Sequence, residues 1–149
     1  MKIAVVDGQG GGMGRSLIDK IRTKLGNDIE IIALGTNSAA TATMLKGGAN
    51  SGATGENAII YNVCRCDVIM GSVGIIAADA FLGELTPRVA TAITQSEAVK
   101  ILIPINKSYL FIAGTKDAML ADYMDDAIKL LEKVKMDIEI HRIAHGHCH

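Results

Sequence analysis

The chain has 149 residues, with 15 Lys and Arg against 16 Asp and Glu and a formal net charge of −1. A chain of this length forms one domain of ordinary size, which excludes a second catalytic domain. The balanced charge provides no broadly basic surface, so we expect no nucleic-acid partner.

No segment of the sequence predicts export or membrane insertion. The first apolar run, residues 3–6, is too short for a signal peptide. The apolar, charge-free stretch 68–78 falls well below the roughly 18 residues that a membrane-spanning helix needs. Three cysteines cannot all pair within one chain. We therefore expect a cytoplasmic protein with reduced thiols and no membrane partner.

Short apolar runs alternate along the chain with segments of helical periodicity. Ser38 and Thr86 are suited to be helix N-caps, and Pro87 suits a first helical position. Residues 50–57 have the composition of a loop. We predict strands at 3–6, 29–34, 58–63, 68–70, 100–105 and 109–113, and helices from the glycine cluster to residue 25 and at 39–46, 75–82, 87–96 and 118–134.

This alternation predicts an α/β three-layer sandwich with a mostly parallel sheet and a central first strand. The last two predicted strands are joined only by residues 106–108, and a link so short cannot make a parallel crossover. We therefore expect an antiparallel pair at one edge. Residues 1–135 form the predicted domain, and 136–149 form a His- and Cys-rich tail.

The strongest chemical signal is a glycine cluster between the first strand and the first helix. Glycines there let a phosphate approach the backbone, and the helix N-terminus supplies amide groups and a positive dipole end. The cluster predicts a nucleotide phosphate site. Its candidate residues are Asp7, Gly8, Gly10, Gly11, Gly12, Met13 and Gly14.

Three glycine templates compete for the cluster. The dinucleotide pattern G-x-G-x-x-G needs a glycine or alanine where Met13 stands, and the P-loop pattern lacks its lysine. The short-chain dehydrogenase variant G-x-x-x-G-x-G is met by Gly8, Gly12 and Gly14, but the Tyr-x-x-x-Lys pair of those enzymes is missing. The alternative interpretation of the cluster is that its glycines only form a tight turn, which lets the first helix lie close to the sheet.

Polar residues at the ends of other strands complete the predicted nucleotide site. Ligands of doubly wound sheets bind at the carboxyl ends of the strands. No Asp or Glu follows the glycines at the distance typical of a ribose-binding carboxylate. Thr36, Asn37 and Ser38 could instead bind a ribose or its 2′-phosphate, and Ser72 ends another strand. We expect NAD(P) or another nucleotide as ligand, with Asp7 hydrogen-bonded within the glycine loop.

The end of the chain predicts a different class of site. Histidine and cysteine gather at His141, His145, His147, Cys148 and His149, with spacings that suit Zn²⁺ or Ni²⁺. Cys64 and Cys66 could add thiolates, although small buried side chains are the simpler interpretation of both. Metal handling or metal sensing is therefore the alternative function. The competing interpretation of the same residues is a polar tail that binds metal only weakly.

The chain as a whole resembles a family of small bacterial proteins of unknown function. The resemblance rests on the segments MKIAVVDGQGGGMG, ALGTNSAAT, GATGENAI, GELTP and ILIPIN, within residues 1–130. It implies a Rossmann-like fold and no particular activity. Since the chain is poor in aromatic residues and has an apolar segment at 75–82, we also expect a homo-oligomer that completes its core by self-association.

Overall fold

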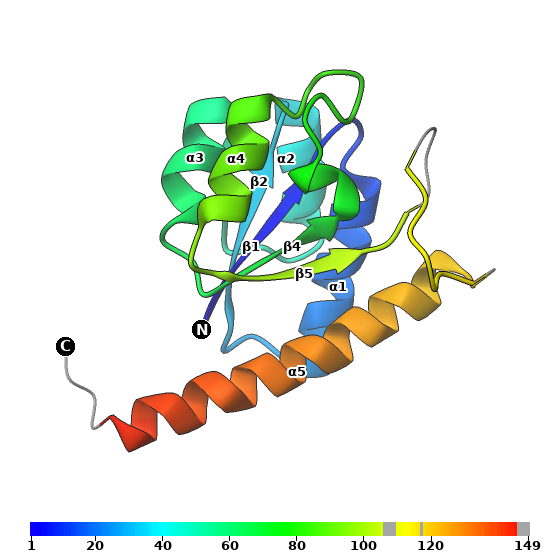
Figure 1. Ribbon diagram of the computed structural model, residues 1–149. Helices are drawn as coiled ribbons and strands as arrows, with labels where there is room; N and C mark the ends of the chain where they lie inside the picture. Colours follow the sequence, from blue (N-terminus) through cyan, green and yellow to red (C-terminus); the bar gives the residue numbers. More distant parts are fainter. Residues whose placement is uncertain (106–109, 117, 146–149) are drawn as a thin grey trace.

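The computed structural model describes residues 1–105, 110–116 and 118–145, which form a parallel sheet covered by helices (Figure 1). The strand order is β3-β2-β1-β4-β5, and every described pair of neighbouring strands is parallel. This order, which reverses beside β1, is that of a Rossmann-like fold. The strands are β1 (Lys2–Asp7), β2 (Glu30–Gly35), β3 (Ser51–Thr54), β4 (Val68–Ser72) and β5 (Val99–Ile103).

The central position of β1 follows from its side chains. Residues 3–6 are fully buried, and alternate residues point to opposite faces of the sheet. Ile3 and Val5 belong to one core cluster, whereas Ala4 and Val6 belong to the other. A strand that is apolar on both faces needs helices on both sides, which confirms the predicted three-layer α/β sandwich with a central first strand.

Each face of the sheet is covered by its own set of helices. The first core cluster joins the sheet to α1, α2 and α5, and the second joins it to α3, α4 and a short 3₁₀ helix, η1. Figure 1 shows α3 and α4 on one side of the strands and α5 on the other. The helices are α1 (Gly12–Leu25), α2 (Ser38–Lys46), α3 (Glu56–Val63), η1 (Val73–Ile76), α4 (Pro87–Gln95) and α5 (Leu120–Ala144).

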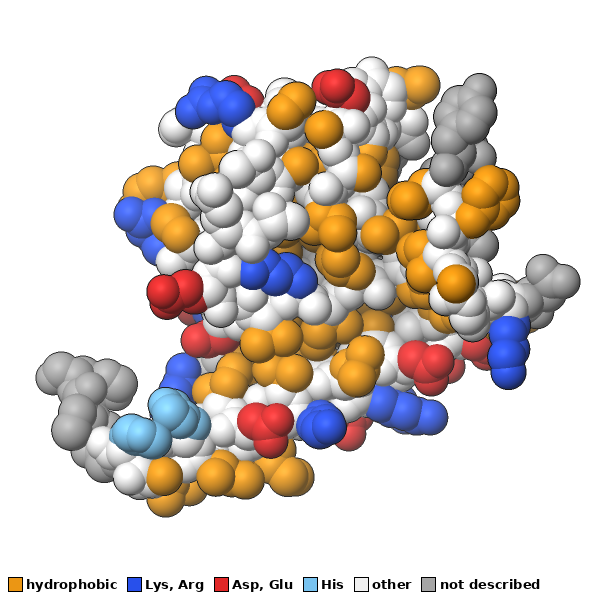
Figure 2. Space-filling model, viewed as in Figure 1, with side chains coloured by type: hydrophobic (Ala, Val, Ile, Leu, Met, Phe, Trp, Pro, Cys, Tyr) orange, Lys and Arg blue, Asp and Glu red, His pale blue; other side chains and the backbone are white. Residues whose placement is uncertain are grey.

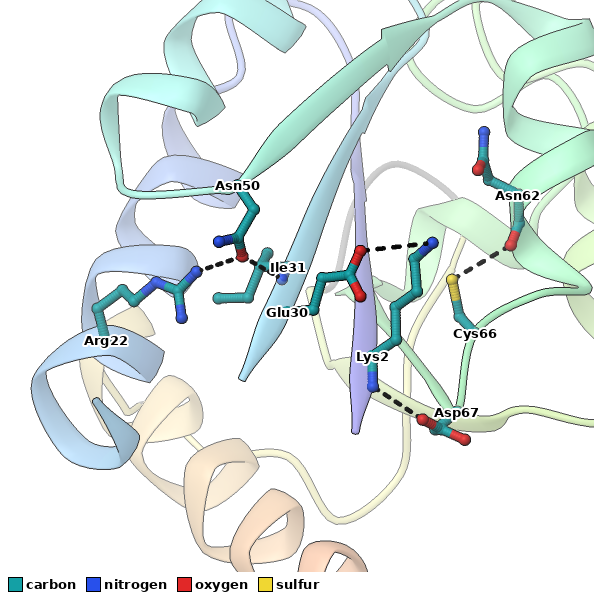
Figure 3. Close-up of polar contacts among 8 residues, drawn as sticks. All are labelled: Lys2, Arg22, Glu30, Ile31, Asn50, Asn62, Cys66 and Asp67. Atoms are coloured by element: carbon teal, nitrogen blue, oxygen red, sulfur yellow. Dashed lines mark hydrogen bonds and ion pairs between the residues drawn. The ribbon is translucent and has the colours of Figure 1, made fainter. Parts of the chain in front are cut away.

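Polar side chains fasten the amino-terminal edge of the sheet (Figure 3). Asn50 accepts hydrogen bonds through Oδ1 from Arg22 Nη2 at 2.7 Å and from the Ile31 amide at 2.8 Å. Asp67 accepts one from the Lys2 amide at 2.8 Å. These contacts satisfy backbone hydrogen-bonding groups at the starts of the strands. The opposite edge, at the carboxyl ends of the strands, is therefore the one left for a ligand-binding site.

The predicted antiparallel edge is wrong. β5 ends at Ile103 and its neighbour β4 is parallel to it. Pro104 follows directly and has no amide hydrogen to donate to a strand ladder, so the expected continuation to residue 105 fails. In the described part of 109–113, residues 110–113, no strand is found, while 106–109 lie outside the described residues.

The predicted strand at 58–63 is also wrong, because these residues belong to α3. Ile59 and Val63 are its buried residues, four positions apart on one helix face. A short apolar run does not by its period distinguish a buried strand from a helix. The predicted loop contains β3 instead, and Gly52 in this strand has no room for a side chain because Thr41 Cγ2 would lie 2.8 Å from its Cβ.

Two helix predictions need smaller corrections. Residues 75–82 do not form a helix: η1 ends at Ile76, and Asp79, Phe81 and Leu82 all have positive φ. Helix α5 does not stop at 134 but continues to Ala144. The predicted N-cap Thr86 is confirmed, since its Oγ1 accepts a hydrogen bond from the Val89 amide.

Helix α5 covers the sheet with its first half and extends past it with its second. Met124, Ile128 and Leu131 are buried in the core cluster that includes the sheet. Near its end, Arg142 Nη2 lies 3.7 Å from Asp67 Oδ2. Within the described residues, no helix combines the length and hydropathy that crossing a membrane requires.

The contrast between two adjacent leucines of α5 gives a test of this packing. Leu131 is fully buried, whereas Leu130 keeps 54% of its surface exposed. Leu131→Ala is expected to lower the free energy of unfolding by about 2–5 kcal/mol because it leaves a cavity in the core. Leu130→Ala should change it by less than about 0.5 kcal/mol. Urea unfolding of both variants measures the difference, and equal effects would contradict the placement of α5.

Candidate functional site

The glycine loop, residues 8–11, joins the carboxyl end of β1 to the first turn of α1. Asp7, the last residue of β1, is 6% exposed and holds this loop with both carboxylate oxygens. Oδ1 accepts a hydrogen bond from the Gly8 amide and Oδ2 accepts one from the Gly14 amide, each at 2.8 Å. Asp7 is therefore hydrogen-bonded within the loop, as predicted, and fixes where the loop begins and ends.

Close packing explains three glycines of the cluster. A Cβ at Gly8 would lie 2.7 Å from Thr36 Oγ1 and 2.8 Å from a ring carbon of Phe81. Gly11 has φ 76° and its Cβ would lie 2.6 Å from a carbonyl oxygen of α2. A Cβ at Gly14 would meet Met44 Sδ at 2.5 Å. At these three positions neighbouring atoms of the protein occupy the space that a side chain would need, which explains why glycine is found there.

Gly10 and Gly12 differ, because among the described residues no atom beyond their chain neighbours and the backbone of α1 lies within 4 Å of a Cβ built at either position. The amides of Gly10, Gly12 and Met13 donate no hydrogen bond to any residue that the structure describes. The first turn of α1 also has neither a side-chain cap nor an acidic residue. In this turn the Asp7 carboxylate binds the Gly14 amide, while the amides of Gly12 and Met13 remain as donors beside two glycines.

A cavity of about 1070 Å³ opens in front of this loop. It lies at the carboxyl ends of β1 and β4, where the strand order reverses and where ligands of such sheets bind. Its wall combines backbone amides with apolar side chains. The described lining includes residues 7–13, 72–74 and 77–82, together with Pro104, Ile105, Leu110, Thr115, Lys116, Ala118, Leu120 and Tyr123.

Ser72 is the buried hydroxyl of this cavity, at the end of β4. It is 4% exposed, and its Oγ accepts a hydrogen bond from the Gly74 amide at 3.2 Å. Its own hydroxyl hydrogen has no acceptor among the described residues, so it is available to a ligand in the cavity. The predicted candidates Asp7, Gly8, Gly10, Gly11, Gly12, Met13 and Ser72 thus line one space, while Gly14 lies behind it.

The other predicted candidates lie on the far side of Gly8, at the end of β2. Thr36 and Asn37 donate hydrogen bonds to the same atom, Glu84 Oε1, at 2.6 and 2.8 Å. Asn37 also caps α2, because its Oδ1 accepts from the Ala40 amide. The predicted cap Ser38 is instead the first residue of α2. None of these three residues is among the described residues that line the cavity.

Glu84 is the residue of this region that sequence reasoning missed. Besides the two side chains from the end of β2, its Oε1 accepts a hydrogen bond from the Gln9 amide at 2.9 Å. The hydrogen bond from Thr36, then those from Gln9 and Asn37, holds the pKa of Glu84 below its usual range. No spacing in the sequence joins Glu84 to Thr36, so only the folded chain brings them together.

The chain belongs to the family described as "Domain of unknown function (DUF3842)", which matches residues 2–136. Among solved structures, the chain is similar to a dodecameric FMN-dependent UbiX-like decarboxylase from Escherichia coli O157:H7. The TM-score is 0.46 with 16% sequence identity, over 91% of this chain and 77% of that one. No curated protein matches the chain significantly. The predicted resemblance to an uncharacterised family is thus confirmed.

The predicted metal ligands do not form a metal site in this DUF3842 protein as far as it is described. His141 and His145 lie together at the end of α5, shown in pale blue in Figure 2, with ring centroids 4.0 Å apart. Cys64 and Cys66 donate to carbonyl oxygens of α3. No group of three or more His, Cys, Asp or Glu within the described ranges could hold a metal ion. His147, Cys148 and His149 lie outside those ranges.

The environment of Cys66 explains why it is a poor ligand. Burial raises the pKa of its thiol to about 11, so the thiol is protonated at neutral pH, whereas metals bind the thiolate. Its Sγ lies 3.2 Å from the Asn62 carbonyl oxygen (Figure 3). The interpretation of Cys66 as a partly buried small side chain fits this geometry better than the metal interpretation.

The lowered pKa of Glu84 predicts a pH-dependent contribution to stability. A carboxylate whose pKa is lowered by folding stabilises the fold above its unfolded pKa, and this contribution is lost as the pH falls through the lowered value. Glu84→Gln is therefore expected to cost about 1 kcal/mol of unfolding free energy at pH 7. The cost should shrink at pH values below about 4.

The matched control is Glu97→Gln, since the exposed Glu97 side chain makes no hydrogen bond or ion pair with a described residue. Denaturant unfolding at several pH values measures both variants. A cost for Glu84→Gln that stays constant down to pH 3, or that equals the cost for Glu97→Gln, would contradict the contacts of Glu84.

Proposed function

We propose that this protein binds a nucleotide through a phosphate group held at residues 10–13, where the glycine loop meets the first turn of α1. The single observation that carries this proposal is that Gly10, Gly12 and Met13 line a large cavity with backbone amides that donate to no described residue. The amides of Gly10, Gly12 and Met13 are the donors for the phosphate oxygens, because hydrogen-bond donors at a helix N-terminus favour an anion.

Asp7 and the filled glycines serve the site indirectly. Asp7 accepts hydrogen bonds from the amides of Gly8 and Gly14, and the amides of Gly10, Gly12 and Met13 are not among its described donors. Gly11 and Gly14 allow the loop and α1 to lie close to α2. Ser72 and Lys116 border the same cavity and supply further donors for an anionic ligand.

The rest of the ligand lies among apolar side chains opposite the glycines. Ile105, Leu110 and Tyr123 line that part of the cavity. A space with backbone donors at one end and aromatic and aliphatic side chains at the other suits a phosphate joined to a planar base. The volume of about 1070 Å³ leaves ample room for such a molecule.

Adding a side chain at Gly12 tests the proposal. A panel of NAD, NADP, ATP and FMN is screened by thermal unfolding of the untagged protein. A nucleotide at about 100 times its Kd should raise the Tm by about 5–10 °C. Gly12→Val should abolish this shift because the new side chain occupies the phosphate position, while leaving the Tm of the free protein within a few degrees.

The control is Ala39→Val, which adds a β-branched side chain to an exposed position in the first turn of α2, outside the cavity. It should keep the nucleotide shift. The absence of a shift with every nucleotide, or an unchanged shift in Gly12→Val, would overturn the proposal.

A second candidate function, metal handling or sensing through the tail, is favoured by one observation. The imidazoles of His141 and His145 lie together on one face of α5, one turn apart, as a pair of Zn²⁺ or Ni²⁺ ligands requires. His145 Nδ1 lies 2.9 Å from the His141 carbonyl oxygen, which leaves Nε2 as the ligating atom. Further ligands would come from His147, Cys148 and His149.

A truncation decides this second candidate. Untagged full-length protein and a chain ending at Ile140 are purified without chelator and their metal content is measured. The full-length protein is expected to carry close to one equivalent of Zn²⁺ or Ni²⁺, and the truncated chain is expected to lose it. Equal metal content in the two proteins would remove the metal function.

A cytoplasmic location and a homo-oligomeric state remain proposals. Apolar side chains of Met136, Ile140 and Ile143 are exposed in the second half of α5. Their spacing places them on one face of the helix, and Figure 2 shows apolar side chains along the outer margin of this end of α5. An exposed apolar stripe of this kind is compatible with self-association.

A further inference from the structure

The link between η1 and α4 crosses the carboxyl ends of β1 and β4. Residues 77–86 of this link contain three residues other than glycine with positive φ, namely Asp79, Phe81 and Leu82. Internal hydrogen bonds hold the link together, among them Asp79 N to the Leu85 oxygen at 2.7 Å and Leu85 N to the Ala80 oxygen at 3.1 Å. A backbone conformation this unfavourable persists only where the surrounding contacts enforce it.

Two side chains of the link supply these contacts. The ring of Phe81 lies against both glycines that border the switch in strand order. Its carbons are 2.8 Å from a Cβ built at Gly8 and 3.1 Å from one built at Gly74. Glu84 Oε1 accepts three hydrogen bonds, from Gln9, Thr36 and Asn37. The link is thus fastened to the glycine loop and to the end of β2.

These contacts divide the crevice into a filled half and an empty half. Above Gly8, toward β2, the space is occupied by Thr36, Phe81 and Glu84. Above Gly10 and Gly12 no described residue fills it, and the cavity continues from there toward β4 and β5. In sheets of this type a dinucleotide lies across the switch point, with one ribose near the end of β2. That half is filled by the chain itself.

We propose that Phe81 and Glu84 determine the ligand class of the site: it takes a nucleoside monophosphate or a similar phosphate monoester and excludes dinucleotides. This rests on the proposed function, since the phosphate is the group held at residues 10–13. The base or other body of the ligand then lies on the side of β4 and β5, against Ile105, Leu110 and Tyr123. The carboxylate of Glu84 occupies the position at the end of β2 where a ribose of a dinucleotide would lie.

Glu84 differs from a ribose-binding carboxylate in its contacts. A carboxylate near the end of β2 holds the ribose hydroxyls in many dinucleotide-binding folds. Here the Oε1 atom of Glu84 is already the acceptor for three donors of its own chain, and Glu84 is not among the described residues that line the cavity. The negative charge also disfavours a second phosphate on this side.

Matched ligand pairs test the inference on the wild-type protein. AMP is compared with NAD and FMN with FAD by isothermal titration calorimetry, so that each dinucleotide contains the mononucleotide with which it is compared. At least one mononucleotide is expected to bind about tenfold or more tightly than its dinucleotide. A dinucleotide that binds as tightly as its half in both pairs would overturn the inference while leaving the proposed function intact.

Removing the side chains that fill the half of the crevice near β2 should weaken the preference for the mononucleotide over the dinucleotide. The double variant Phe81→Ala, Glu84→Ala is expected to bind the dinucleotide at least about tenfold more tightly than the wild type does, while mononucleotide affinity changes less than about threefold. Glu97→Ala is the control for loss of a carboxylate elsewhere. Circular dichroism and a cooperative thermal transition establish that the double variant is folded.

Three further outcomes have a definite meaning. If the folded double variant discriminates between the ligands as the wild type does, Phe81 and Glu84 do not set the ligand class and the inference is wrong. If the double variant does not fold, the single variant Glu84→Gln takes its place, with the same expected direction of change. If none of the four ligands binds the wild type, the proposed function itself fails and the inference fails with it.

Discussion

The buried carboxylate of Asp7 is the constraint on which the rest of the site depends. A buried charge needs hydrogen-bond donors, and Asp7 finds them in the amides of Gly8 and Gly14, at the two ends of the glycine loop. The positive end of α1 favours the same charge. One side chain at the end of the central strand thereby fixes the path of the loop and the direction in which α1 leaves it. The amides of Gly12 and Met13 stay outside this contact.

The glycine cluster satisfies two opposite requirements within seven residues. Gly8, Gly11 and Gly14 are places where the protein's own atoms come so close that no side chain fits. Gly10 and Gly12 have empty space in front of them. A sequence motif records only that all five lack a side chain. The distinction between packing and binding roles, on which the proposed phosphate site depends, exists only in the folded structure.

How much could be predicted from the sequence depends on how far apart the interacting residues lie along the chain. The buried run in β1, the helical spacing in α1 and the Thr86-Pro87 start of α4 are local signals, and all three are confirmed. β3 was missed because an edge strand beneath α2 carries small side chains and no apolar pattern. Phe81 and Glu84 were missed because their partners, Gly8 and Thr36, lie far away in the sequence and are joined to them only by the crossover of the sheet.

The segment from the end of β4 to the start of α4, residues 72–86, carries both Phe81 and Glu84 and borders both halves of the crevice. Ser72, at its start, faces the cavity, and Glu84, near its end, is bonded to the end of β2. Phe81 lies between them and contacts both Gly8, which follows β1, and Gly74 in η1. One aromatic ring therefore packs at the ends of both strands that border the switch in strand order. The strained backbone of Asp79, Phe81 and Leu82 is the cost of placing that ring over both strands at once.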